Sequence, residues 1–169
     1  MIRKRVEKIR NIVYYIEYGD GLFIFKRGDL NMSQQKCVFC SIVNGEIPSA
    51  TIYENSEFKV ILDAFPSGVG HTLIFPKEHF ENIYDLDAET ASKLFAFVTI
   101  VARALKKVLK CDGMNLLQNN GEVAGQTVFH FHMHLIPRFA NDGLKFSWAT
   151  KKFDQEEMNN LATEIGKNI

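Results

Sequence analysis

Residues 129–136 read Phe129-His130-Phe131-His132-Met133-His134-Leu135-Ile136, and this stretch decides the fold of the chain. Successive side chains of a β-strand point to opposite faces, so alternating residue types predict a strand with one polar and one apolar face. His130, His132 and His134 would line the polar face. Buried imidazoles each need a hydrogen-bond partner, which makes three in a row costly without a purpose. We therefore interpret the stretch as a functional site and not as a polar face that happens to be rich in histidine.

Residues 119–127 lead into this stretch and read Asn119-Asn120-Gly121-Glu122-Val123-Ala124-Gly125-Gln126-Thr127. Glycines let backbone N–H groups approach an anion closely, and the Gln and Thr side chains add donors. The loop therefore predicts a phosphate site beside the histidines. A neutral imidazole, with an ordinary pKa of about 6.5, can attack phosphorus without a separate base. Alternating histidines also bind metal ions in some zinc enzymes, and that alternative stays open here.

The flanking sequence predicts an α+β fold of antiparallel strands and two or three helices. Apolar residues at three- and four-residue spacing predict a long helix over residues 87–110, capped by Asp87 and ended by Gly113. Aromatic and β-branched residues predict strands over Phe58–Leu62, 71–75, 115–118 and 128–138. We also expect a hairpin over 12–18 and 22–25, a helical turn over 37–43 and a terminal helix over 154–166.

The length of 169 residues fits one domain and not two full ones. We place that domain at residues 32–140, between an N-terminal extension over residues 1–31 and a C-terminal tail and helix over residues 141–169. The extension is basic, and Met32 after it is a second candidate start. Residues 1–31 are therefore either a functional element or a product of translation upstream of the native start, and both readings stay open.

Charge and composition narrow the classes of partner and compartment. Lys and Arg total 20, and Asp and Glu total 20, so the chain lacks the basic excess of a general nucleic-acid coat. No apolar run approaches the roughly 20 residues of a membrane span. The three cysteines are an odd number, and no secretory pattern precedes them. We expect a cytoplasmic protein with free thiols or a metal site, and no nucleic-acid or membrane partner.

Two of the cysteines form a Cys-x-x-Cys pair, Cys37 and Cys40. A redox role would need a thioredoxin-like βαβ unit around the pair, and the polar sequence before it does not predict one. A zinc role needs two more ligands, for which the five histidines are available. The remaining interpretation is that Cys37 and Cys40 are two small buried thiols with neither a redox role nor a metal.

Residues 130–136 match the signature of the histidine-triad (HIT) superfamily, in which histidines alternate with apolar residues. The lead-in loop, residues 37–42, Asp63 and residues 70–72 also resemble the family, so the likeness runs from about Cys37 to Arg138. It is greatest to the Hint-like branch, and within it to the bacterial type with a Cys-x-x-Cys start. Galactose-1-phosphate uridylyltransferases share the triad but are much longer and carry a proline within it, unlike this chain.

The resemblance implies an enzyme that cleaves purine nucleoside phosphoramidates or dinucleoside polyphosphates at the α-phosphate. His132 would be the nucleophile that forms a nucleotidyl-histidine, His134 would donate to a phosphate oxygen, and His130 would set the tautomer of His132. Asp63 would accept hydrogen bonds from the ribose. The resemblance also implies contacts with the base by Phe39, Ile42 and Leu62, for which core packing is the alternative role. At the phosphate it implies contacts by Asn119, Gly125, Gln126 and Thr127, of which Thr127 is also catalytic.

For the cysteine pair, the resemblance implies one structural zinc per chain, bound by Cys37, Cys40, His79 and His130. The alternative function is a zinc-stabilised nucleotide sensor or interaction protein whose turnover is incidental. The Trp-Pro-Pro-Gly ending of eukaryotic Hint-like proteins is missing, and the Gly-Gln-Thr-Val of residues 125–128 also occurs in dinucleoside-polyphosphate hydrolases of the fragile-histidine type. The leaving group and the physiological substrate therefore stay open.

The family fold is a five-stranded antiparallel sheet with a long helix and a short helix, and two copies join into a ten-stranded sheet. The sequence supports a dimer independently. Phe97 and Ile100 lie off the main apolar face of the long helix, and residues 115–118 could pair edge to edge with a second copy. We therefore predict a twofold homodimer with this helix and this strand at its interface.

Overall fold

The computed structural model describes residues 13–18, 21–26, 37–147 and 149–169. The chain divides into two units, residues 1–138 and residues 139–169, and each is described by itself. The turn at residues 19–20 and the expectations about Met32 lie outside the described residues. No helix in the described ranges is long and apolar enough to cross a membrane.

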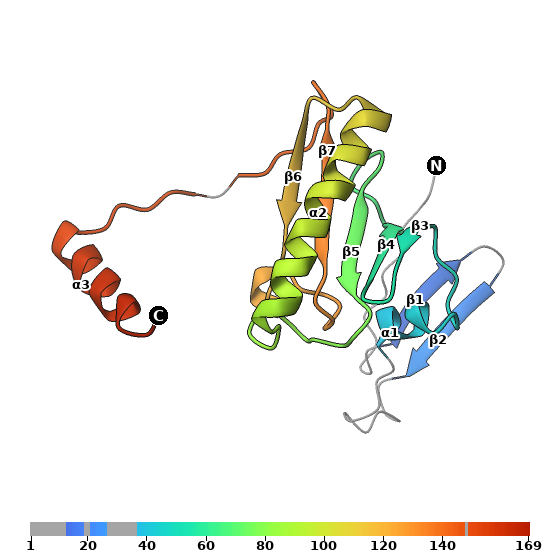
Figure 1. The fold of residues 1–169 in the computed structure, drawn as a ribbon, viewed down its shortest axis with the longest axis horizontal. Helices are drawn as coiled ribbons and strands as arrows, with labels where there is room; N and C mark the ends of the chain where they lie inside the picture. The colour runs from blue at the N-terminus through green and yellow to red at the C-terminus, as the bar shows by residue number, and fades with distance from the viewer. Residues whose placement is uncertain (1–12, 19–20, 27–36, 148) are drawn as a thin grey trace. The chain divides into compact units, whose positions relative to one another are not determined.

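A five-stranded antiparallel sheet is the centre of the first unit, with the strand order β3-β4-β5-β7-β6 (Figure 1). The predicted class, with a long helix and a short helix beside such a sheet, is confirmed. The expected hairpin forms as a separate antiparallel pair. The strands are β1 (Val13–Tyr18), β2 (Gly21–Lys26), β3 (Thr51–Glu54), β4 (Phe58–Leu62), β5 (Thr72–Pro76), β6 (Gly113–Leu117) and β7 (Met133–Arg138).

The long helix begins and ends within one residue of its predicted bounds, but it is not ended by the predicted glycine. The side chain of Asp87 accepts a hydrogen bond from the backbone N–H of Thr90 at 2.9 Å, which caps the first turn. Lys110 takes the left-handed conformation that ends the helix (φ 52°), so the predicted role of Gly113 was wrong, and that glycine begins β6. The helices are α1 (Val38–Val43), α2 (Ala88–Leu109), the 3-10 turn η1 (Glu122–Ala124) and α3 (Gln155–Gly166).

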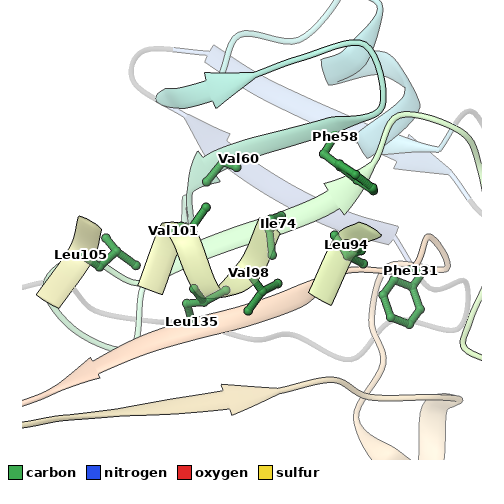
Figure 2. Packing of buried hydrophobic residues seen from close by; sticks show 9 residues of the cluster. All are labelled: Phe58, Val60, Ile74, Leu94, Val98, Val101, Leu105, Phe131 and Leu135. Atoms are coloured by element: carbon green, nitrogen blue, oxygen red, sulfur yellow. The ribbon is translucent and has the colours of Figure 1, made fainter. Parts of the chain in front are cut away.

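Side chains alternate between two cores, one on each face of the sheet. On β5, Ile74 points to the face covered by α2, whereas Leu73 and Phe75 point to the face covered by α1. Figure 2 shows the first core between α2 and the sheet. The second core holds the α1 side chains Phe39 and Ile42. The central strands β4 and β5 are therefore buried on both faces, and β5 is the neighbour on which β7 pairs.

Two strands differ from the sequence prediction. The sequence analysis missed β3 because all four of its residues are exposed, so no apolar alternation marks it. The predicted strand over residues 128–138 was wrong in its first half, since β7 begins at Met133. Phe131 nevertheless enters the α2 core, as expected from the alternation. The alternation of side chains therefore begins before the first residue of the hydrogen-bonded ladder.

Gly70 should not tolerate a side chain. Its φ is +76°, and a Cβ there would overlap Cδ1 of Leu109, so Gly70→Ala combines backbone strain with crowding. We expect the substitution to lower the free energy of unfolding by about 1–3 kcal/mol in urea titrations. Gly166→Ala is the matched control, because its Cβ would meet no atom within 4 Å. Equal stability of the two variants would contradict this account.

Candidate active site and metal centre

His130 is fully buried and makes contacts through both ring nitrogens. Its Nε2 lies 2.8 Å from the backbone carbonyl of Pro76, and because a carbonyl only accepts, this nitrogen carries the proton. The ring stands edge-on to Phe39 and Phe75, with centroids 5.7 Å from each. Burial lowers the pKa of His130 to about 4. Its Nδ1 therefore has an unprotonated lone pair at neutral pH, as a metal ligand requires.

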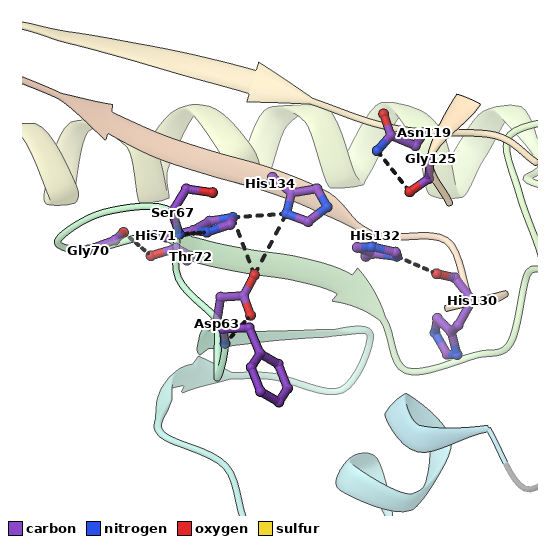
Figure 3. A network of polar contacts seen from close by, with 11 residues as sticks. Asp63, Ser67, Gly70, His71, Thr72, Asn119, Gly125, His130, His132 and His134 are labelled. Carbon is purple, nitrogen blue, oxygen red and sulfur yellow. Dashed lines mark hydrogen bonds and ion pairs between the residues drawn. The ribbon is translucent and has the colours of Figure 1, made fainter. Parts of the chain in front are cut away.

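His132 is the residue whose geometry fits a nucleophile. Its Nδ1 donates to the backbone carbonyl of His130 at 2.7 Å, so Nε2 keeps the lone pair (Figure 3). Burial lowers the pKa of His132, which keeps the ring neutral. Nε2 has no hydrogen-bond partner among the described residues, and no buried side-chain nitrogen or oxygen there is left without one. This nitrogen therefore reaches open space, where a substrate can approach it.

His134 is set in the opposite tautomer by a relay that begins at a backbone amide. The N–H of Ser67 donates to Nδ1 of His71 at 3.0 Å, so the proton of His71 is on Nε2. That Nε2 lies 2.9 Å from Nδ1 of His134 and 3.4 Å from a carboxylate oxygen of Asp63 (Figure 3). His134 consequently carries its proton on Nε2. Burial, and then the neighbouring His132, lower its pKa to about 4.

Two adjacent imidazoles thus present different groups. His132 offers a lone pair and His134 offers an N–H, and their ring centroids are 4.9 Å apart. An attacking nitrogen beside a donor is the arrangement that phosphoryl transfer uses, because the donor can stabilise charge on a phosphate oxygen. Asp63, His71 and His134 are also close enough to hold a metal ion. The Ser67 amide argues against that reading, because it leaves a proton on the His71 nitrogen that would have to bind the metal.

A second cluster gathers Cys37, Cys40, His79 and His130, whose ligand atoms all lie within 4.8 Å of one another. Nδ1 of His130 is 3.4 Å from Sγ of Cys37 and 3.6 Å from Sγ of Cys40, and Nδ1 of His79 is 3.4 Å from Sγ of Cys40. Tetrahedral zinc with ordinary bond lengths separates sulfur from nitrogen by about 3.6 Å. The donor set and its spacing therefore fit zinc, and the predicted ligands are brought together.

The Cys40 thiol stays protonated at neutral pH unless a cation lies beside it. Burial, followed by the neighbouring Cys37, raises the pKa of Cys40 to about 11. A metal ion reverses this trend, since a coordinated thiol is deprotonated. The third cysteine, Cys111, is buried and is not part of the cluster.

The loop before the triad is closed on itself. The N–H of Gly121 donates to Oε1 of Gln126 at 2.8 Å, and the N–H groups of Ala124, Gly125 and Gln126 bond within the loop. Nε2 of Gln126 donates to the carbonyl of Glu81 at 2.7 Å. These four N–H groups are therefore bonded within the loop and do not form the expected phosphate cradle. Gln126 is buried and holds the loop in shape.

The remaining predicted contacts are placed in different environments. Phe39 stacks on Phe75 with ring centroids 4.5 Å apart, and Ile42 shares its core. Leu62 is exposed beside Asp63, and Thr127 is exposed at the end of the loop. Asn119 donates to the carbonyl of Gly125 at 3.4 Å. Contacts of these residues with a nucleotide stay predictions.

The sequence analysis gave His71 no role and did not anticipate Ser67 or the carbonyl of Pro76. Ser67 and Pro76 act through backbone atoms, so their residue type carries little signal, whereas His71 acts through its ring. The one available hint was the turn over residues 64–70, which places His71 at the start of a strand beside Asp63.

Comparison with known proteins agrees with this geometry. The HIT domain family matches residues 44–141. Protein hit of Bacillus subtilis is 42% identical over 138 residues, which cover 80% of this chain and 95% of that protein. The crystal structure of a HIT family protein from Bacillus anthracis matches with a TM-score of 0.76 and 40% identity, covering 80% of this chain and 98% of that one. The chain therefore belongs to the HIT domain family.

Further relatives have names that state an activity or a metal. Adenosine 5′-monophosphoramidase HNT1 of Saccharomyces cerevisiae is 37% identical, covering 76% of this chain and 80% of its own. Adenylylsulfatase HINT3 of Arabidopsis thaliana is 37% identical, covering 74% of this chain and 62% of its own. A zinc-bound histidine triad protein from Mycobacterium smegmatis matches with a TM-score of 0.62 and 42% identity, covering 74% of this chain and 88% of that one. Membership of this family supports nucleotide hydrolysis in general.

Proposed function

We propose that this protein cleaves purine nucleoside phosphoramidates or dinucleoside polyphosphates at the α-phosphate, through a nucleotidyl intermediate on His132. The observation that carries the proposal is the 2.7 Å hydrogen bond from Nδ1 of His132 to the carbonyl of His130. It leaves Nε2 as an oriented, neutral nucleophile. The names of the yeast and Arabidopsis relatives support the class of reaction.

The reaction has two displacements at phosphorus. Nε2 of His132 attacks the α-phosphorus, a P–N bond forms, and the bond from phosphorus to the leaving group breaks; a leaving amine takes up a proton from solvent, which the water of the second step returns. Water then attacks the same phosphorus, the P–N bond breaks, and the nucleoside monophosphate leaves. Nε2–H of His134 donates to a non-bridging oxygen in both steps. Thr127 and Asn119 contact the phosphate or the leaving group, and Asp63 accepts from the ribose.

A turnover screen tests the substrate class. Adenosine 5′-phosphoramidate and adenylyl-linked amines are compared with dinucleoside polyphosphates, with nucleoside monophosphate release as the readout. Hydrolysis of either set supports the proposal, and the ratio of kcat/KM identifies the preferred leaving group. Binding of AMP without turnover of any member would favour the alternative, a nucleotide sensor.

The relay through His71 should affect the rate more than the fold. His71→Ala removes the donor that sets the tautomer of His134, so we expect kcat to fall by about 10- to 100-fold while KM changes less. His71→Gln, whose amide can donate to the same nitrogen, should recover part of the loss. A kcat within twofold of the parent in the alanine variant would contradict the relay, provided that its unfolding temperature is unchanged.

We further propose that the Cys37, Cys40, His79 and His130 cluster binds one structural zinc ion per chain. The four donors complete a tetrahedral set, so no open position remains for substrate. The proposal rests on the spacing of the donors and on the zinc-bound relative. The ion would fix α1 to the start of the triad.

A homodimer completes the proposal. Strand β6 is an edge of the sheet, and Leu116 on it is exposed. On α2, Phe95 and Ile100 are also exposed. Phe97, in contrast, packs on Phe58 of its own chain, with centroids 5.9 Å apart. Ile100 is therefore a better interface probe than Phe97.

Light scattering tests the dimer. We expect a mass of two chains at micromolar concentration, and a mass of one chain for Ile100→Asp, because the exposed apolar side chain would meet its symmetry mate across a twofold axis. Ser92→Asp, at an exposed polar position of α2, is the matched control and should remain dimeric. A single-chain mass for the parent protein would overturn the dimer, and a dimeric Ile100→Asp would overturn the interface.

A further inference from the structure

His130 belongs to both the metal centre and the triad. Its Nδ1 faces the sulfur atoms of Cys37 and Cys40 at 3.4 and 3.6 Å, while its backbone carbonyl accepts the hydrogen bond that orients His132. We propose that Cys37 and Cys40 form a reversible disulfide that switches off the nucleophile His132 by releasing His130. This inference rests on the proposed function, because it assigns a regulation to that same site.

The segment that carries His130 depends on side-chain contacts for its position. The ladder between β5 and β7 begins at the pair Ile74 and Met133, so residues 130–132 precede it. Among the described residues, one backbone hydrogen bond holds this segment to a neighbouring segment, from the N–H of Phe131 to the carbonyl of Phe80 at 2.6 Å. The side chain of Phe131 is buried in the α2 core, and both ring nitrogens of His130 make further contacts. Loss of one of the His130 contacts therefore acts directly on the carbonyl that His132 uses.

The two thiols are placed to form a disulfide. Cys37 is the N-cap of α1 with extended backbone (φ −57°, ψ 126°), and Cys40 lies in the first turn. Their sulfur atoms lie within 4.8 Å of each other, and both residues are partly exposed. A Cys-x-x-Cys pair at the start of a helix is also the arrangement of disulfide oxidoreductases. Cys111 is buried and takes no part in the cluster, so it does not compete.

Hydrogen peroxide is a sufficient oxidant. One thiol loses its proton and the thiolate attacks a peroxide oxygen; the O–O bond breaks, and the hydroxide that leaves takes up that proton, so a sulfenic acid and water result. The second thiolate attacks the sulfenic sulfur, the S–S bond forms, and a second water leaves. Two thiols lose two electrons and two protons, and one peroxide becomes two waters. A dithiol reductant reverses the change.

The disulfide removes two of the four donors of the metal centre, so the centre can no longer hold zinc tightly. Nδ1 of His130 is then a buried acceptor without its partner, which is unfavourable. We expect residues 130–132 to shift, and the bond from Nδ1 of His132 to the carbonyl of His130 to break. Nε2 of His132 is then no longer fixed toward the substrate.

The experiment treats zinc-loaded Cys111→Ala protein with hydrogen peroxide and follows thiols, released zinc and kcat together. We expect the loss of both remaining thiols, release of the zinc and a fall in kcat of about 10- to 100-fold. Dithiothreitol with zinc should restore the rate, and a chelator alone should lower it without loss of thiols. A disulfide with zinc release and a kcat within twofold of the start would overturn the switch. So would a loss of rate while both thiols remain reduced.

Nitrogen-15 NMR of His132 separates this inference from the proposed function. In the reduced, zinc-loaded protein we expect a protonated Nδ1 and an unprotonated Nε2, and oxidation should abolish this fixed pattern. If oxidation changed the protonation pattern of His132 in a protein that hydrolyses no nucleotide, the proposed function would be overturned, whereas the effect of the disulfide on His132 would still be supported. If the protonation pattern of His132 were unchanged after disulfide formation, the switch would be overturned, whereas the proposed function would be unaffected.

Discussion

His132→Ala is expected to lower kcat for nucleotide hydrolysis by roughly 10⁴-fold or more, because loss of the nucleophile leaves only binding and electrostatic contributions. Neither of the other two triad imidazoles can substitute. Nε2 of His130 is bound to Pro76, and the lone pair of His134 faces His71. The neighbouring donor Nε2–H of His134 should still bind the phosphate.

Affinity for AMP is the control for this variant. We expect the dissociation constant, measured by calorimetry, to stay within about tenfold of the parent, a loss of no more than 1.4 kcal/mol. We expect a lower unfolding temperature as well, because the His132 side chain is buried and its removal leaves a cavity. Hydrolysis at near the parental rate would contradict the nucleophile assignment, whereas loss of AMP binding would mean that the ring acts mainly in binding.

Cys37→Ala should have the largest effect on stability. It removes one of four donors around a centre that joins α1 to His130, and binding to a structural metal site contributes directly to folding free energy. We expect the purified variant to contain little zinc and to lose about 3 kcal/mol of stability or more, equivalent to roughly 10 °C in unfolding temperature. Metal analysis and calorimetry measure both.

Cys111→Ala is the matched control, because this cysteine is buried outside the cluster. This variant should keep its zinc, and its free energy of unfolding should fall only slightly, because one small core side chain is shortened. If Cys37→Ala kept one zinc per chain, or lost its zinc at no cost in stability, the structural role of the centre would be refuted.

The elements that bury a regular apolar face were predictable from the sequence. Strand β4 was placed correctly at Phe58–Leu62, and α2 within one residue at each end, because burial repeats with the period of the element. Strand β3 has no buried face and was missed. The start of β7 was misplaced because residues 130–132 keep a strand-like alternation of side chains without ladder bonds.

The chemistry at the site was predictable only in outline. The residue types and the HIT resemblance indicated His132 as the nucleophile and named the four metal ligands that the fold brings together. The resemblance implied that His130 sets the tautomer of His132, but not that its backbone carbonyl does so. The roles of the Pro76 carbonyl and the Ser67 amide at the other rings were not predicted. Such groups are present in every residue, so only the folded chain reveals which of them lie at a ring nitrogen.

The central claim is that Nε2 of His132 becomes covalently bonded to the nucleotide. The most direct test mixes the protein with adenosine 5′-phosphoramidate, quenches it in base within the first turnover, and maps the peptides by mass spectrometry. The account predicts one adenylyl group on the peptide that contains His132, bonded to that residue and absent from His132→Ala. Turnover without any adduct, or an adduct on His130 or His134, would contradict it.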